Sequence, residues 1–131
     1  MKGLALAIVM AAIATPGAAQ DFSGGVAAKG KAVFARCSGC HAVGAGATNK
    51  AGPHLNDLIG RVAGSLPGYK YSPAMIEAGK GGLAWTGETL WTFLTNPRES
   101  VPGNKMAFPG IKDPAQLADL IAYLAIQAGD R

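Results

Sequence analysis

The stretch Cys37-Ser38-Gly39-Cys40-His41 decides how the rest of this sequence is interpreted. The pattern C-x-x-C-H is the attachment signal for a c-type haem. Each thiol can add to one vinyl group of a porphyrin, and the histidine that follows then places an imidazole under the iron. The small residues Ser38 and Gly39 let the backbone lie close to the ring. The stretch therefore predicts one covalently bound haem c.

The same two cysteines have other possible uses. A thioredoxin-type dithiol belongs to a βαβ pattern, and no strand pattern surrounds this stretch. A structural zinc site needs four ligands. The other candidate nitrogen and sulfur donors are His54 and the four methionines of the chain. A plain disulfide would suit an exported protein but would leave His41 without a role. The haem interpretation uses all three residues and is favoured over these alternatives.

Residues 1–19 have the pattern of a secretory signal peptide. Lys2 is followed by an apolar run over 4–13, by a break at Pro16, and then by small residues. The run is too short to span a bilayer, which takes about 20 apolar residues; an N-terminal membrane anchor is the alternative. We expect the segment to be removed on export to the periplasm, which leaves a single domain over residues 20–131.

Composition narrows the class of protein. Glycine accounts for 19 of the 131 residues, well above the average of about 7%, so tight loops must be frequent. Two cysteines exclude a disulfide-rich scaffold, and a net charge of +4 is too small and too scattered for a nucleic-acid-binding surface. A domain of this size buries too little apolar surface to be very stable alone, and a bound haem would complete its core.

Helix signals occur at four places, and no strand is predicted, so the fold class is all-α. A first helix covers about 25–36, a second begins at its cap Ser72 and stops at Gly79, and a third runs from Thr86 to the residue before Asn96-Pro97. The last helix has the clearest signals: Asp113 caps it, Gln116 completes a capping box, and Gly129 ends it. Its apolar stripe consists of Leu117, Leu120, Ile121, Leu124 and Ala128.

A haem held by one histidine has a second axial position, and three residues are candidates for it. Met106 lies in a loop that has Pro-Gly pairs at both ends, where a thioether has no helix face to pack against. Met75 lies in the short second helix and can equally be a core residue. His54 is the second histidine of the chain and follows Pro53.

Further segments follow the haem motif in a fixed order. They are Gly52-Pro53-x-Leu55, Gly60-Arg61, Pro67-Gly68-Tyr69-Lys70-Tyr71, Trp85, Asn96-Pro97, Pro102-Gly103-x-Lys105-Met106-x-Phe108 and Asp119-Leu120-Ile121-Ala122-Tyr123-Leu124. With Cys37–His41 they resemble class I cytochrome c, of the mitochondrial cytochrome c and bacterial cytochrome c2 type, over about residues 24–127. The resemblance implies the cytochrome c fold, in which small helices and Gly/Pro-rich loops wrap around one haem.

The resemblance also implies site residues. Cys37 and Cys40 would carry the thioether bonds, His41 would be the proximal ligand with its other ring nitrogen donating to the Pro53 carbonyl, and Met106 would be the distal ligand. Three residues match those that hold the haem propionates, which are costly to bury without partners: Arg61, Tyr71 and Trp85. Phe108 would cover the haem edge. Alternatively, Trp85 is plain core and Arg61 a surface cation, and His54 is expected at the surface.

In the family the last helix crosses the first, so Gly30 is expected to permit close approach. Phe34 stands three residues before Cys37, whereas relatives commonly have an aromatic residue four before it, so either Val33 or Phe34 could fill the crossing. Phe93 stands where many relatives carry a tyrosine whose hydroxyl donates towards the methionine sulfur.

The implied activity is single-electron transfer by a soluble, monomeric carrier, not enzyme catalysis. Methionine ligation raises the reduction potential. Basic residues beside the Cys and Met segments would steer the protein towards acidic docking patches: Lys31, Arg36, Lys50, Arg98, Lys105 and Lys112. Suitable partners are a cytochrome bc1 complex, a terminal oxidase or a photosynthetic reaction centre, docked transiently and without a membrane span.

Two alternative functions would use the same haem motif. A haem enzyme or gas-binding protein is disfavoured, because no distal histidine or arginine is spaced to act on bound peroxide. A dedicated subunit of one dehydrogenase would have the same fold, and the sequence hardly distinguishes it from a diffusing carrier.

Overall fold

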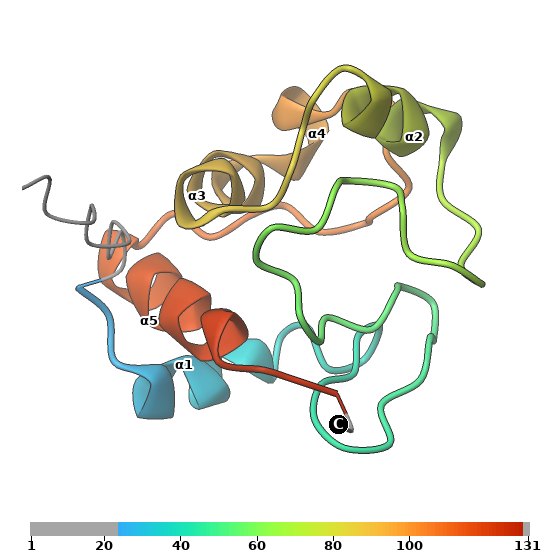
Figure 1. Cartoon of the computed structure of the whole chain (residues 1–131). Coiled ribbons are helices and arrows are strands. Elements are labelled where there is room, and N and C mark those ends of the chain that lie inside the picture. Colours follow the sequence, from blue (N-terminus) through green and yellow to red (C-terminus); the bar gives the residue numbers. More distant parts are fainter. Residues whose placement is uncertain (1–23, 130–131) are drawn as a thin grey trace, which may run out of the picture.

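A computed structural model describes residues 24–129 of the chain. This part folds into five helices joined by long loops (Figure 1), and the predicted signal peptide lies outside it. The helices are α1 (Ala27–Phe34), α2 (Pro73–Lys80), α3 (Gly87–Thr95), α4 (Pro97–Ser100) and α5 (Pro114–Ala125). Within the described range, β-pairing is limited to one isolated bridge between Val62 and Ala84. The prediction of an all-α fold is confirmed.

Helices α1 and α5 lie against each other in Figure 1, and glycine makes their close approach possible. A Cβ atom on Gly30 would lie 2.6 Å from the Asp119 carbonyl carbon and 2.7 Å from Tyr123 Cβ. Real Cβ atoms do not come this close, so the expected role of Gly30 is confirmed. Phe34 is buried, and its ring lies 5.5 Å from that of Tyr123, so Phe34 fills the crossing while Val33 is half-buried.

Both of these helices are shorter than predicted. Helix α1 ends at Phe34, where the chain tightens: the N–H groups of Arg36 (3.1 Å) and Cys37 (2.7 Å) bond to the carbonyls three residues earlier, and these turns lead into the haem motif. Helix α5 ends at Ala125, not at Gly129 as predicted, so Ala128 is not part of the helical stripe. The chain leaves the helix there because the Gln127 carbonyl accepts the N–H of Asp57 at 2.9 Å.

Helices α2 and α3 begin where their capping residues predict. The Ser72 hydroxyl accepts the Met75 N–H at 3.1 Å, and α2 runs one residue past the predicted stop at Gly79. At α3, Thr86 and Thr89 exchange side-chain and backbone hydrogen bonds in a full capping box.

Helix α4 is absent from the sequence prediction, in which Asn96-Pro97 marks only the end of α3. The same pair also starts α4: the Asn96 side chain accepts the Glu99 N–H, and Pro97 occupies the first helical position. At α5, Asp113 accepts the N–H groups of Ala115 (2.8 Å) and Gln116 (3.3 Å), which confirms the predicted cap.

The buried core gathers side chains from α1, α3, α5 and the loops between them. Its members are Phe34, Leu58, Ala63, Trp85, Leu90, Phe93, Leu94, Val101, Ile111, Leu117, Leu120, Ile121 and Leu124. Several of these also form the wall of a cavity that opens between the helices and the loops. Between residues 24 and 129 no helix has the length and apolar character needed to cross a membrane.

Candidate haem-binding site

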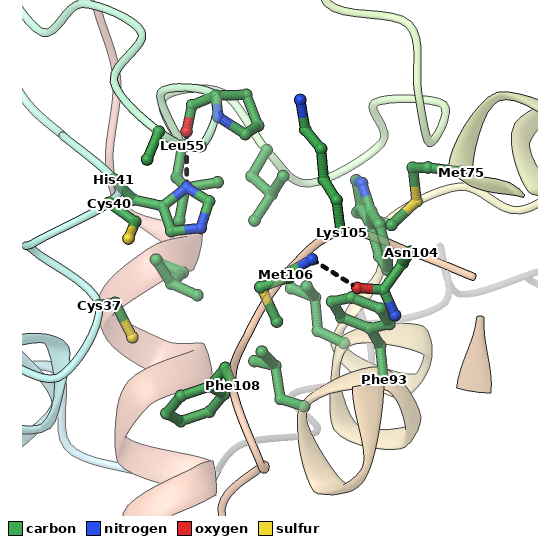
Figure 2. A pocket seen from close by; sticks show the side chains of 18 of the residues that line it. Cys37, Cys40, His41, Leu55, Met75, Phe93, Asn104, Lys105, Met106 and Phe108 are labelled. Carbon is green, nitrogen blue, oxygen red and sulfur yellow. Dashed lines mark hydrogen bonds between the residues drawn. The ribbon is translucent and has the colours of Figure 1, made fainter. Parts of the chain in front are cut away.

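A largely apolar cavity of about 360 Å³ lies between the helical core and the loops. Segments far apart in the sequence line it: the Cys37–His41 motif, the loops over 51–55, 69–72 and 104–108, and the inner faces of α3 and α5. Its size is within the usual range for small-molecule and cofactor sites, about 300 to 1,000 Å³. Figure 2 shows this cavity with many of its side chains.

The structure brings all nine predicted site residues to this one cavity. They are Cys37, Cys40, His41, Pro53, Arg61, Tyr71, Trp85, Met106 and Phe108. Met75 also lines the cavity, whereas His54 does not. His54 is half-buried, and its backbone is bonded on both sides: its carbonyl accepts a hydrogen bond from Arg61 at 3.0 Å, and its N–H donates to Asn49.

The two cysteines are held on consecutive turns after α1. The Cys37 carbonyl accepts the N–H groups of Cys40 (3.1 Å) and His41 (2.9 Å), so the motif curls on itself and presents its side chains on the cavity side (Figure 2). Both thiols are free. Burial raises the pKa of the Cys37 thiol, and the nearby Arg36 guanidinium partly opposes this. The Lys50 ammonium donates to the Ser38 carbonyl at 2.6 Å and ties a second loop to the motif.

His41 is fixed by a hydrogen bond and by a glycine. Its Nδ1 lies 2.7 Å from the Pro53 carbonyl oxygen, which accepts the ring proton and leaves Nε2 for the cavity (Figure 2). A Cβ on Gly52 would lie 2.7 Å from Nδ1 of His41, so the Gly52 backbone lies directly against the ring. Burial lowers the pKa of His41; the bond to Pro53 opposes this, and Lys50 and Arg61 add to it. A metal ligand must present an unprotonated ring nitrogen, and with Nδ1 bonded to Pro53 that nitrogen is Nε2.

Met106 enters the cavity from the loop that follows α4 (Figure 2). Its N–H donates to Asn104 Oδ1 at 2.8 Å, and its carbonyl accepts the Phe108 N–H at 3.0 Å. Phe93, from α3, is buried close by and packs against Trp85 with 5.0 Å between ring centroids. Because position 93 carries no hydroxyl, this wall of the cavity is apolar.

Two further polar side chains, those of Arg61 and Tyr71, also line the cavity. Arg61 donates to the carbonyls of His54 (3.0 Å) and Asn56 (3.4 Å), and burial lowers its pKa. The Tyr71 hydroxyl accepts the Leu66 N–H at 3.3 Å, and burial raises its pKa. A guanidinium and a phenol, both able to donate hydrogen bonds, therefore line one cavity whose wall is largely apolar.

Two of the six predicted docking cations line the cavity. The Arg36 guanidinium lies 5.3 Å from the centroid of the Phe108 ring, and Lys105 Nζ lies 4.6 Å from that of Tyr69. Lys105 also donates to the Lys70 carbonyl. The other four do not line the cavity: Lys31, Lys50, Arg98 and Lys112.

Sequence reasoning gave no role to Asn104, and it predicted neither the bond from Lys50 to Ser38 nor the contact between Gly52 and His41. A signal for Asn104 exists, because an asparagine side chain readily accepts a backbone N–H two residues further on. Lys50 and Gly52 act through contacts between loops, for which the local sequence carries no signal.

The donor set fits a haem. A soft thioether and an imidazole suit haem iron, two thiols stand on the same side of the cavity, and the Gly52 backbone forms a close cradle for the imidazole that a Cβ would fill. A structural zinc site has four ligands, and among residues 24–129 no three histidine, cysteine, aspartate or glutamate side chains are grouped to hold a metal ion.

Comparison with known proteins places the chain in a family. Residues 27–127 match the model of the family described as Cytochrome c. The chain is 54% identical over 107 residues to a cytochrome c2 of Agrobacterium tumefaciens (strain II Chrys), with 82% of this chain and 96% of that protein covered.

Solved structures of cytochromes c have a similar fold. The fold is similar to that of cytochrome c2 from Rhodospirillum centenum (TM-score 0.74, 36% identity, 79% of this chain and 99% of that one). It is also similar to cytochrome cH from Methylobacterium extorquens (TM-score 0.69, 42% identity, 76% and 97%). The chain therefore belongs to the cytochrome c family, whose members carry one covalently attached haem c and serve as electron carriers, not enzymes.

Proposed function

We propose that this chain is a soluble, periplasmic single-electron carrier whose haem is bound through Cys37 and Cys40 and ligated by His41 and Met106. One observation carries the proposal: an imidazole and a thioether from two distant segments project into the same apolar cavity, beside two free thiols (Figure 2). Export is supported by the signal-peptide pattern of residues 1–19.

When bound, the haem supplies an iron centre that accepts and releases one electron. The chain's own residues prepare the site for that chemistry. The bond between His41 and Pro53 fixes the imidazole tautomer and orientation. Met106, as an uncharged soft ligand, favours the reduced state and raises the potential. Apolar side chains such as Phe93 and Leu94 keep water away from both ligands and favour the less charged state.

The polar part of the wall would hold the haem propionates. Arg61 offers positive charge there, and Tyr71 and Trp85 offer further side-chain donors. Buried carboxylates are stable only when they are paired or hydrogen-bonded, so these three residues would offset the cost of burying them.

Electron exchange would occur where the cavity meets the surface, near Arg36 and Lys105. Both are exposed, and both line the cavity. Positive charge at this place would guide the protein to redox partners with acidic docking patches, in transient complexes whose rate of formation falls with salt. Membrane-bound redox complexes are the class of partner proposed.

The test compares the two methionines that line the cavity. In the ferric holoprotein, Met106→Ala is expected to abolish the weak charge-transfer absorption of sulfur-ligated haem, whereas Met75→Ala is expected to retain it. Loss of the band in Met75→Ala alone would assign the ligand to Met75 and contradict the proposal. Mass spectrometry of the mature protein tests export, with an N-terminus near residue 20 as the expected result.

A further inference from the structure

The loop that carries Met106 is tied to α4 by one side chain, that of Asn104. Its Oδ1 accepts the Met106 N–H at 2.8 Å, and its Nδ2 donates to the carbonyls of Pro97 and Val101, each at 2.8 Å. All three bonds go to the backbone. The polar atoms of Asn104 are therefore used to fix the chain, although the residue also lines the cavity (Figure 2).

The partner of this side chain is a rigid part of the fold. Pro97 is one of the most deeply buried residues, at under 2% exposure, and Val101 is 5% exposed. The Val101 N–H donates to the Pro97 carbonyl at 3.0 Å, and the cap formed by Asn96 closes the other end of α4. Asn104 therefore connects Met106 to an element that can move little without opening the core.

The far end of the loop is held separately. A Cβ on Gly110 would lie 2.8 Å from the Thr95 carbonyl carbon, and the Ile111 N–H donates to the Leu94 carbonyl at 2.8 Å. That attachment lies four to five residues beyond Met106, whereas Asn104 lies two residues before it. Loss of the Asn104 side-chain bonds would leave Met106 N–H without its partner and would loosen that half of the loop, which would keep the backbone bond from Asn104 to Val101 and the bond from Lys105 to Lys70.

We infer that Asn104 is the positioning residue for Met106, because it binds the Met106 N–H and α4 at the same time. The inference rests on the proposed function, since it takes Met106 to be the iron ligand. A thioether has no charge to hold it at a metal, so the placement of its backbone governs how easily another ligand displaces it. Sites of this kind depend on such support from neighbouring residues.

The test measures the rate at which added imidazole displaces the methionine in the ferric holoprotein. Asn104→Ala is expected to raise this rate roughly tenfold, the size expected when one or two net hydrogen bonds are lost. Asn104→Asp keeps the oxygen that accepts the Met106 N–H, but it replaces the donor to the Pro97 and Val101 carbonyls with a carboxylate oxygen that repels them. It is therefore expected to accelerate displacement as well. Both variants should also have a lower midpoint potential, because methionine ligation raises it.

Asn49→Ala is the matched control. Its side chain also accepts a backbone N–H, that of His54 at 3.0 Å, but it lies outside the cavity lining. The control is expected to keep the wild-type displacement rate. The inference would be overturned if Asn49→Ala accelerated displacement by imidazole equally, or if both Asn104 variants kept the wild-type rate. If Asn104→Ala does not fold, the displacement rate of Asn104→Asp alone tests the inference. A wild-type protein without the sulfur-ligand absorption would instead overturn the proposed function, and the inference with it.

Discussion

The backbone of Gly52 lies directly against the imidazole of His41, so that a Cβ atom at position 52 would come within 2.7 Å of Nδ1 and 2.9 Å of Nε2. The ring cannot turn away freely, because Nδ1 is bonded to the Pro53 carbonyl at 2.7 Å. The Gly52 N–H itself donates to the Cys40 carbonyl at 2.8 Å, so the two backbones are also joined. Position 52 therefore controls where the imidazole lies.

Gly52→Ala is expected to push the ring or the loop aside. Overpacking of this kind costs about 1 to 3 kcal/mol, so the free energy of unfolding of the holoprotein should fall by that amount in denaturant titrations. Gly81→Ala is the control, since its nearest contact would be an ordinary 3.4 Å. Equal stability of the two variants would contradict the close contact at Gly52.

Cys37→Ser combined with Cys40→Ser is expected to leave haem that acid solvent can extract. Serine keeps the small size of the side chain and the turn but cannot form a thioether. Extraction followed by absorption spectroscopy checks the result. Ser38→Ala, in the same motif, should keep the haem covalently bound; haem that stays bound in the double variant would refute attachment at these cysteines.

Gly30→Ala sets two effects of opposite sign against each other. Replacing glycine by alanine inside a helix favours the helix by about 1 kcal/mol. The new Cβ would, however, lie 2.6 Å from the Asp119 carbonyl carbon and force α1 from α5. We expect the clash to exceed the helix propensity, with a net loss of about 1 to 2 kcal/mol in denaturant titrations. A gain in stability would show that the two helices can move apart at little cost.

Lys105→Glu is expected to slow electron transfer to an acidic partner at low salt, and much less at high salt. Charges are screened over about 10 Å at 0.1 M ionic strength and about 3 Å at 1 M. Stopped-flow rates across a salt series check this. Lys29→Glu makes the same change of charge at an exposed position outside the cavity lining and should have a smaller effect. A loss that does not depend on salt would point to the contact between Lys105 and Tyr69 instead.

The starts of α2, α3 and α5 were predictable because each depends on residues a few positions apart. Ser72, Thr86 and Asp113 each satisfy backbone N–H groups two or three residues away, and all three cap helices in the structure. The predicted end of α5 was wrong because it depends on residues far away in the sequence. The bonds that draw the chain off the helix come from Asp57, about 70 residues earlier, where no local pattern could show them.

The haem motif could likewise be identified from five consecutive residues, because thiol and imidazole spacing is fixed within one or two turns of chain. The sequence alone therefore determined the cofactor, the fold class and the candidate ligands. Only the tertiary structure decided that Gly52 lies against His41, that Phe34 rather than Val33 meets Tyr123, and that Asn104 joins Met106 to α4. Contacts of this kind depend on the direction of each side chain after distant segments have packed, and spacing along the chain does not specify that direction.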